Sequence, residues 1–91
     1  MVRRSRLEIY FEILEVIEKG FVRPTRIMYK TNLSWHTLQD LFTTLITNGF
    51  IKEEREGSTN IYQVTDKGRS ALSYYLKASD ELSKAEEIFD I

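Results

Sequence analysis

The sequence predicts an α+β domain that is mostly α, with three helices, a β-hairpin and a long C-terminal helix. Apolar residues recur at spacings of three and four through residues 5–48, between caps formed by Ser or Thr and stops formed by Gly. Two segments typical of strands, 50–55 and 61–64, then flank a polar turn. A further helical pattern opens at Thr65 and extends toward the end of the chain.

Length and composition restrict the class of protein. A chain of 91 residues forms one domain, small enough that a long exposed apolar surface is expected to need a partner. It has no cysteine, which excludes disulfides and thiolate sites, and no apolar run near the roughly 20 residues that cross a bilayer. The basic N-terminus leads directly into glutamates, unlike a signal peptide. We therefore expect a cytoplasmic protein with no membrane contact.

The net charge of −1 divides unevenly along the chain. Residues 1–79 hold 12 Lys and Arg against 9 Asp and Glu, a balance of +3. Residues 80–91 hold one Lys against 5 acidic residues, a balance of −4. The positive excess therefore lies with the short helices and the hairpin, and the negative excess lies in a tail. An asymmetry of this size also arises by chance.

The first helix is predicted from its cap and its apolar stripe. Ser5 and Glu8 have the S-x-x-E spacing of a capping box, and Gly20 is placed for the left-handed residue that ends a helix. They bound a helix of about 14 residues. The side chains expected on its inner face are Leu7, Tyr10, Phe11, Leu14 and Ile17.

Two further helices are predicted in the next 25 or so residues. The second opens with Thr25 as the expected N-cap and turns Ile27 and Met28 inward. Ser34 is the expected cap of the third helix, and Gly49 is its stop. The inner face of this third helix is predicted to hold Leu38, Leu41, Phe42, Leu45 and Ile46.

The hairpin and the last helix follow without a break. Phe50-Ile51 begins the first strand, the polar turn is predicted over residues 56–60, and the second strand covers residues 61–64. Thr65 is the expected cap of the final helix. Ser79-Asp80 could interrupt that helix by starting a new cap.

This succession resembles the winged helix-turn-helix family, and specifically its small archaeal branch. That branch includes single-domain transcription regulators and ten-kilodalton chromatin-associated dimers. The family typically ends its hairpin with an aromatic, a spacer and an aliphatic residue followed by Thr-x-x-Gly, as Tyr62 to Gly68 does here. The resemblance covers about residues 5–78. It is carried by Thr25–Tyr29, Asn32–Ser34, Leu41–Leu45, Asn48–Ile51, and Tyr62–Gly68 with Ala71-Leu72.

The resemblance implies three functional parts and double-stranded DNA as the partner. Residues 1–4 would be a basic arm, residues 5–68 the winged helix-turn-helix domain, and residues 69–91 a C-terminal dimerisation helix with an acidic end. The helix over residues 34–48 would lie in the major groove, with the hairpin as the wing. DNA contacts are expected from Ser34, Trp35, His36, Gln39, Asp40 and Thr43 in that helix; from Arg3, Arg4, Arg23, Arg26 and Lys30 toward the DNA backbone; and from Arg55, Ser58, Thr59 and Asn60 in the wing.

The chemistry of these side chains fits DNA unevenly. Gln39 has the paired donor and acceptor that read adenine, and Thr43 has a methyl group suited to thymine. Asp40 repels phosphate unless it accepts from a cytosine amine. The alternative is that all of these positions are only the solvated face of an amphipathic helix. For Trp35, packing against the neighbouring helix competes with contact to the sugar-phosphate backbone.

The last helix carries a heptad-like seam. Ser79 and Glu86 weaken it, and a second copy of the chain would bury it. The archaeal relatives dimerise through such a helix, so the resemblance implies a homodimer. The alternative is a helix that folds back onto its own core. The interface residues expected are Leu72, Tyr75, Leu76, Leu82 and Phe89.

No pattern in the chain predicts an enzyme. It contains one His and no Cys, and no spacing that predicts a metal site, a P-loop or a dinucleotide fingerprint, so no cofactor and no metal are expected. No small-molecule effector is evident either. The favoured function is a sequence-specific dimeric transcription regulator located at the nucleoid. An architectural DNA-binding dimer and a protein-interaction module remain alternatives.

Overall fold

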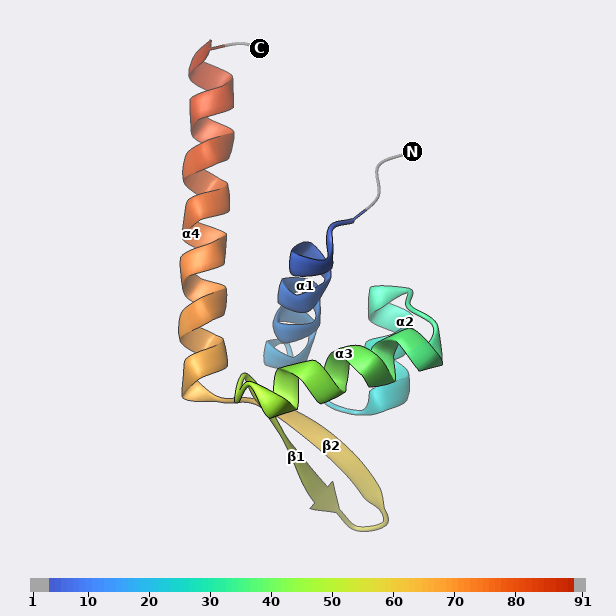
Figure 1. Ribbon diagram of the computed structural model, residues 1–91. Coiled ribbons are helices and arrows are strands. Elements are labelled where there is room, and N and C mark those ends of the chain that lie inside the picture. Colours follow the sequence, from blue (N-terminus) through green and yellow to red (C-terminus); the bar gives the residue numbers. More distant parts are fainter. Residues whose placement is uncertain (1–3, 90–91) are drawn as a thin grey trace.

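The computed structural model describes residues 4–89, and the side chains of residues 4–85. Arg3 and the side chain of Phe89, predicted to contact DNA and a second copy, therefore lie outside the described residues. The elements follow the predicted order, helix, helix, helix, hairpin, helix (Figure 1). Among the described residues, no helix combines the length and the apolar character required to cross a bilayer.

Three short helices form the body of the domain. Helix α1 covers Arg6–Glu18, and the Ser5 hydroxyl accepts from the Glu8 N–H at 3.1 Å, as the capping pattern predicts. Helix α2 covers Pro24–Thr31 with Arg23 as its N-cap. The predicted cap at Thr25 is wrong because Pro24, which needs no N–H partner, already occupies the first helical position.

Helix α3 covers Trp35–Thr47 and is the predicted recognition helix. Its cap is Ser34, whose hydroxyl accepts from the Thr37 N–H at 3.2 Å. Between α2 and α3, Asn32 takes the left-handed conformation at φ 55°, which turns the chain within a few residues. At its other end, Gly49 has φ 77° and stops α3 as predicted.

The wing is a two-stranded antiparallel hairpin. Strand β1 covers Ile51–Glu56, strand β2 covers Thr59–Val64, and Glu56 pairs with Thr59. The turn is therefore only Gly57-Ser58, and the predicted five-residue turn is too long. Gly57, at φ 63°, supplies the left-handed backbone that a two-residue hairpin turn needs.

Helix α4 covers Asp66–Phe89 and gives the molecule its long axis. Its 24 residues make a rod of about 36 Å. It passes through Ser79-Asp80 without interruption, so these residues do not start a new helix. Figure 1 shows its first turns beside α1 and its end standing beyond the body. The molecule measures 52 × 30 × 21 Å as a result.

The core lies between α1, α3 and the base of the wing. The predicted inner faces are correct at most positions, but Leu7 is 60% exposed and Ile46 is 39% exposed. Leu7 lies in the first turn of α1, at the end of the apolar stripe, and Ile46 lies at the edge of the stripe of α3. The buried cluster consists of Ile13, Leu14, Ile17, Ile27, Leu38, Leu41, Phe42, Leu45, Ile51, Tyr62, Val64 and Leu72.

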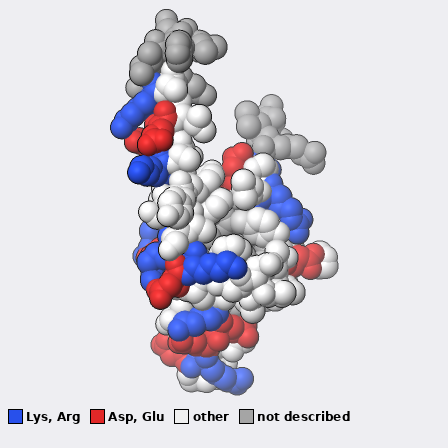
Figure 2. Space-filling model, turned by 60° about the vertical axis from the view of Figure 1, so that its left-hand side comes forward, with Lys and Arg blue, Asp and Glu red and all other residues white. Residues whose placement is uncertain are grey.

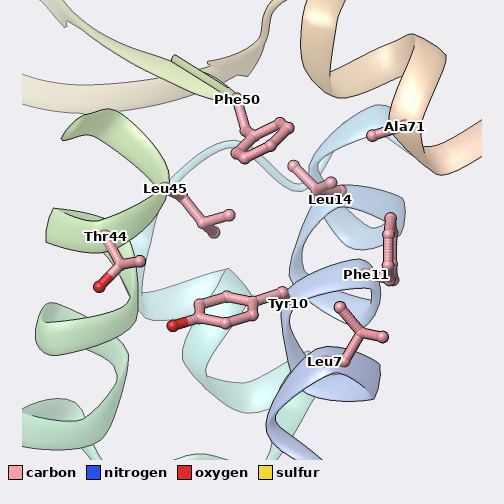
Figure 3. A pocket seen from close by; sticks show the side chains of 8 residues that line it. All are labelled: Leu7, Tyr10, Phe11, Leu14, Thr44, Leu45, Phe50 and Ala71. Carbon is pink, nitrogen blue, oxygen red and sulfur yellow. The ribbon is translucent and has the colours of Figure 1, made fainter. Parts of the chain in front are cut away.

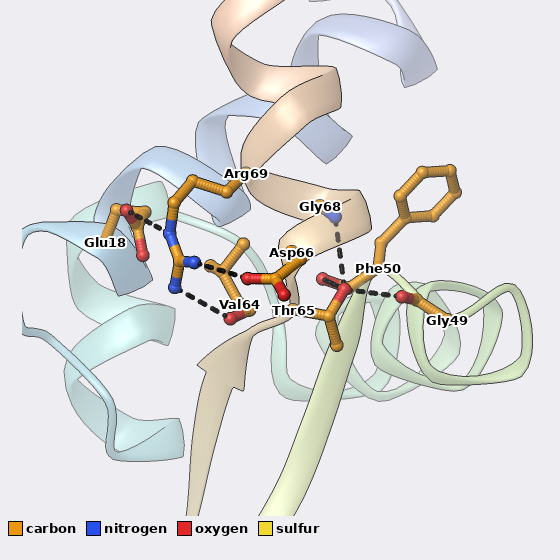
Figure 4. A network of polar contacts seen from close by, with 8 residues as sticks. All are labelled: Glu18, Gly49, Phe50, Val64, Thr65, Asp66, Gly68 and Arg69. Carbon is orange, nitrogen blue, oxygen red and sulfur yellow. Dashed lines mark hydrogen bonds and ion pairs between the residues drawn. The ribbon is translucent and has the colours of Figure 1, made fainter.

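The start of α4 is held against the end of α3 by hydrogen bonds to the backbone carbonyls of Gly49 and Phe50 (Figure 4): the Thr65 hydroxyl donates to the Gly49 carbonyl at 2.6 Å, and the Phe50 carbonyl is approached most closely. This oxygen accepts from the Thr65 N–H at 3.0 Å and lies 3.1 Å from the Thr65 hydroxyl. The same hydroxyl accepts from the Gly68 N–H at 3.1 Å and so caps α4. Gly68 is buried with its Cα hydrogens against the Phe50 carbonyl, where a side chain has no room. The Thr-x-x-Gly pattern therefore serves two purposes: Thr65 caps α4, and Gly68 lets the helix backbone approach the Phe50 carbonyl closely.

A Gly68→Ala substitution should destabilise the domain by about 1–3 kcal/mol, because its Cβ would overlap the Phe50 carbonyl and come 2.8 Å from a Val64 methyl. The usual effect inside a helix is the reverse, a gain of about 1 kcal/mol. Urea unfolding measures the difference. Ser73→Ala, on the exposed surface of the same helix, should stay within about 0.5 kcal/mol of the parent. A Gly68→Ala protein as stable as the parent would contradict the close approach.

Candidate nucleic-acid interface

Helix α3 separates a buried face from a polar face. Leu38, Leu41 and Leu45 are buried, which orients the helix in the body. Of the α3 residues predicted to contact DNA, Trp35, His36, Asp40 and Thr43 are exposed and Gln39 is half-buried, and His36, Asp40 and Thr43 lie on the side opposite the buried leucines. Trp35, the first residue of α3, is 49% exposed, so its side chain is half covered by the body and half open to solvent. Packing of its indole and contact with DNA both remain predictions.

Short-range contacts order this polar face. His36 Nε2 lies 3.6 Å from Asp40 Oδ2, one helical turn away, so a protonated His36 would offset the charge of Asp40. The Thr43 hydroxyl donates to the Gln39 carbonyl at 3.0 Å, which leaves its methyl group outward. Ser34 uses its hydroxyl as the cap of α3. Within the described part of the chain, no group of three or more His, Asp or Glu is placed to hold a metal ion.

The three cations of α2 and its N-cap lie in two regions, one beside the wing and one over the Phe21 ring. Arg23 Nη2 lies 3.9 Å from a Glu56 carboxylate oxygen, at the end of the wing strand. Arg26 and Lys30 instead lie over the Phe21 ring, with their charged groups 5.9 and 4.6 Å from its centroid. These two cations are therefore held on the side of α2 that faces the end of α1.

Arg4 is tied to the body. Its Nη1 donates to Glu12 Oε2 at 2.6 Å and to the Thr31 carbonyl at 2.9 Å. These bonds join the N-terminal segment to α1 and to the last turn of α2. The prediction of a basic arm is therefore corrected at Arg4, whose charge is paired with Glu12.

The wing carries mixed charge. Lys52 Nζ lies 3.2 Å from Glu54 Oε1, and Arg55 is exposed opposite Asn60. Figure 2 shows blue and red side chains alternating over the hairpin at the bottom of the view. Of the other predicted wing residues, Ser58 lies in the turn and Thr59 begins β2. The two strands hold two cations against three glutamates, so the wing offers no net positive charge toward a phosphate backbone.

Tyr62 connects the wing to α3. Its ring stacks on that of Phe42 in α3, with centroids 4.2 Å apart, and its hydroxyl donates to Glu53 Oε2 at 2.7 Å. Burial raises the pKa of the Tyr62 phenol strongly, and the hydrogen bond to Glu53 and the charge of Glu53 raise it further. The root of the wing is therefore fixed to the inner face of the predicted recognition helix.

The predicted dimer residues of α4 fall into two groups. Leu72 is 6% exposed in the domain's own core, and Tyr75 stacks on Phe11 of α1 with centroids 4.1 Å apart. These two residues therefore pack within the chain. This packing matches the alternative prediction, in which the first part of the last helix folds back onto its own core. Farther along, Leu76 is 44% exposed and Leu82 is 67% exposed. Tyr74, which the seam did not include, is 77% exposed.

A comparison with protein families identifies this architecture. Residues 3–83 match the family model described as winged helix-turn-helix. The chain belongs to that family. The match covers the three short helices, the wing and most of α4, so the long helix is included in the family pattern.

Relatives of this winged-helix chain are archaeal. The uncharacterized protein MJ0287 of Methanocaldococcus jannaschii is 39% identical over 71 residues, which make up 78% of this chain and 69% of that protein. MJ0290 of the same organism is 32% identical over 97% of this chain, which spans only 35% of that longer protein. Among solved structures, Sso10a-2, a DNA-binding protein from Sulfolobus solfataricus, is similar with a TM-score of 0.70 and 26% identity over 96% of this chain and 94% of that one.

The pair Glu53 and Tyr62 was missed by the sequence analysis. The two residues are direct cross-strand partners in the hairpin of the winged-helix domain. Their pairing follows from the register, and the register follows from the two-residue turn at Gly57-Ser58. A shorter turn prediction would therefore have brought them together.

Stability at alkaline pH should report on Tyr62. Its folded pKa lies above the value of about 10 in an unfolded chain, so above about pH 10 the unfolded chain releases a proton that the folded chain retains. The free energy of unfolding should therefore fall as pH rises from about 9 to about 11, and fall less in Tyr62→Phe. Denaturant titration measures the slope, with Tyr74→Phe, at an exposed site, as the control. Equal slopes for Tyr62→Phe and the parent would contradict the assignment.

Proposed function

We propose that this protein is a sequence-specific, dimeric transcription regulator that binds double-stranded DNA through α3 and acts at the nucleoid. The observation that carries the proposal is the polar face of α3. A winged-helix body buries one side of this helix and exposes His36, Asp40 and Thr43 on the other. The similarity to Sso10a-2, a DNA-binding protein, over nearly the whole of both chains supports DNA as the ligand.

The N-terminal half of α3 supplies the base contacts. A helix of this kind enters the major groove with its first residues nearest the base edges. Gln39 reads adenine through its amide, and the Thr43 methyl suits thymine. Asp40 disfavours a purely electrostatic mode of binding, because it places a negative charge on the contact face.

Backbone contacts are expected to be few. Arg23 lies at the start of α2, and its guanidinium is next to Glu56 of the wing, so it is placed to contact phosphate beside both α2 and the wing. Arg55 adds a positive charge near the wing turn. Because the wing is of mixed charge, affinity from phosphate contacts alone would be small, which favours the regulator over an architectural protein.

Dimerisation is assigned to the outer part of α4. The outer part of α4 stands beyond the body (Figure 1), and the apolar side chains of Leu76 and Leu82 are exposed along the helix. A second copy would cover these two leucines, and two copies would present two α3 helices to two half-sites. Leu72 and Tyr75 are not needed for this contact, since they already pack within the chain.

Selection from a random duplex library over a salt series tests the proposal. Enrichment of a motif with two half-sites is expected. Binding without a motif, with a steep fall in affinity as salt rises, would favour the architectural alternative. No binding at about 50 mM salt would exclude both DNA functions and favour a protein partner.

A Gln39→Ala substitution should relax the selected motif at one position in each half-site. Loss of a bidentate contact to adenine reduces discrimination by about 1–3 kcal/mol, or about 5- to 150-fold. Repeating the selection with the variant measures this change. Thr47→Ala, near the end of the same exposed face, is the control and should keep the motif. An unchanged preference in Gln39→Ala would remove Gln39 from the contact.

A Leu82→Glu substitution should weaken the dimer by at least about tenfold, because an apolar contact would be replaced by an unpaired charge. Analytical ultracentrifugation over a dilution series gives the dissociation constant. Ser83→Glu adds the same charge at the adjacent exposed position and serves as the control. If both variants dimerise like the parent, the outer part of α4 is not the interface.

A further inference from the structure

A hollow of about 110 Å³ lies on the inner side of α3, opposite its polar face (Figure 3). Helices α1, α3 and α4 and the turn before β1 all contribute to its wall. The rings of Tyr10 and Phe50 and the side chain of Leu45 border the space in the close view. Its lining includes the side chains of Tyr10, Phe11, Leu14, Leu45, Phe50 and Ala71.

The polar groups beside the hollow are already bonded within the chain. The Tyr10 hydroxyl accepts from Arg6 Nε at 3.0 Å. The Thr44 hydroxyl, on a lining residue, donates to the Asp40 carbonyl at 3.3 Å. The Phe50 carbonyl accepts from Thr65. The wall therefore presents carbon, and a water molecule there would find few of the two to four partners that hold buried water.

Size and chemistry together define the ligand that fits. An apolar cavity of about 150 Å³ in another protein stays dry and binds benzene, so a hollow of this order can hold one small ring. A charged or strongly hydrogen-bonding molecule would lose its water without compensation from the wall. The exposed apolar side chains of α4, at Tyr74, Leu76 and Leu82, do not line the hollow.

We propose that this hollow is a binding site for a small uncharged aromatic or aliphatic molecule. Leu7, which lines the hollow and is 60% exposed, lies at its open side and forms the entrance. Inside, the ligand contacts Leu45 on the inner face of α3 and Phe50 at the root of the wing. This site is independent of the proposed DNA function, because every contact is on the side of α3 away from the polar face.

Toluene is the probe for the test. Methyl NMR spectra of the full chain, recorded without DNA, should show saturable shifts for Leu14 and Leu45 as toluene is added. The Ile27 methyl groups, buried in the core and outside the lining, should not move. Absence of saturable shifts at Leu14 and Leu45 up to the solubility of toluene would overturn the proposal.

A pair of matched variants locates the site. Ala71→Leu places a larger side chain in the hollow and should weaken toluene binding at least about tenfold. Ala78→Leu makes the same change on the exposed surface of α4 and should leave binding unchanged. Equal affinity in both variants would overturn the proposed location.

A dilution series distinguishes a ligand from a second copy of the chain. If the Leu14 and Leu45 methyl signals move with protein concentration and toluene does not compete, the hollow is covered by another copy and the proposal fails. If toluene binds with the same affinity at all protein concentrations, the proposal is supported. The outcome does not depend on DNA binding, so a failed DNA selection would leave this test unaffected.

Discussion

The Phe50 carbonyl is the point on which the arrangement of the elements depends. It lies where α3 has ended and β1 has not begun, and it accepts from the Thr65 N–H across the wing at 3.0 Å, while the Thr65 hydroxyl donates to the neighbouring Gly49 carbonyl at 2.6 Å. Gly68 lets α4 pass directly over the Phe50 carbonyl. Arg69 then joins α4 to α1, because its Nε donates to Glu18 at 3.2 Å. The contacts of Thr65, Gly68 and Arg69 together set α3, the wing, α1 and α4 relative to one another (Figure 4).

This fixed frame explains how a small domain presents a polar helix. Burial of Leu38, Leu41 and Leu45 fixes the rotation of α3 about its own axis. The Phe42 ring stacks on the Tyr62 ring, which holds the wing against α3. The exposed face of α3 carries donors, acceptors and an indole and little net charge. Such a face suits recognition of particular groups better than attraction to a charged backbone.

Local chemistry made most of the fold predictable, and tertiary contacts account for the errors. The caps at Ser5, Ser34 and Thr65 each depend on the next three residues, so the sequence alone predicted them. Leu72 and Tyr75, predicted at a dimer interface, instead pack within the chain, because their surroundings depend on how whole helices dock, which periodicity does not encode. The hollow beside Leu45 was also not predicted, since its wall combines residues far apart in the chain. The α3 residues expected to contact DNA are exposed or half-buried, whereas Arg26 and Lys30 lie over the Phe21 ring, and the contacts of all these residues with DNA remain predictions.

The most direct test of the central claim maps the DNA contact on the protein itself. Backbone amide shifts of the full chain should be recorded while a duplex that carries the selected motif is added. The account predicts the largest changes at residues 34–43, with smaller ones at Arg23 and the wing turn. Changes confined to Phe21, Arg26 and Lys30, with residues 34–43 unaffected, would contradict it, because the contact would then lie on the far side of α2.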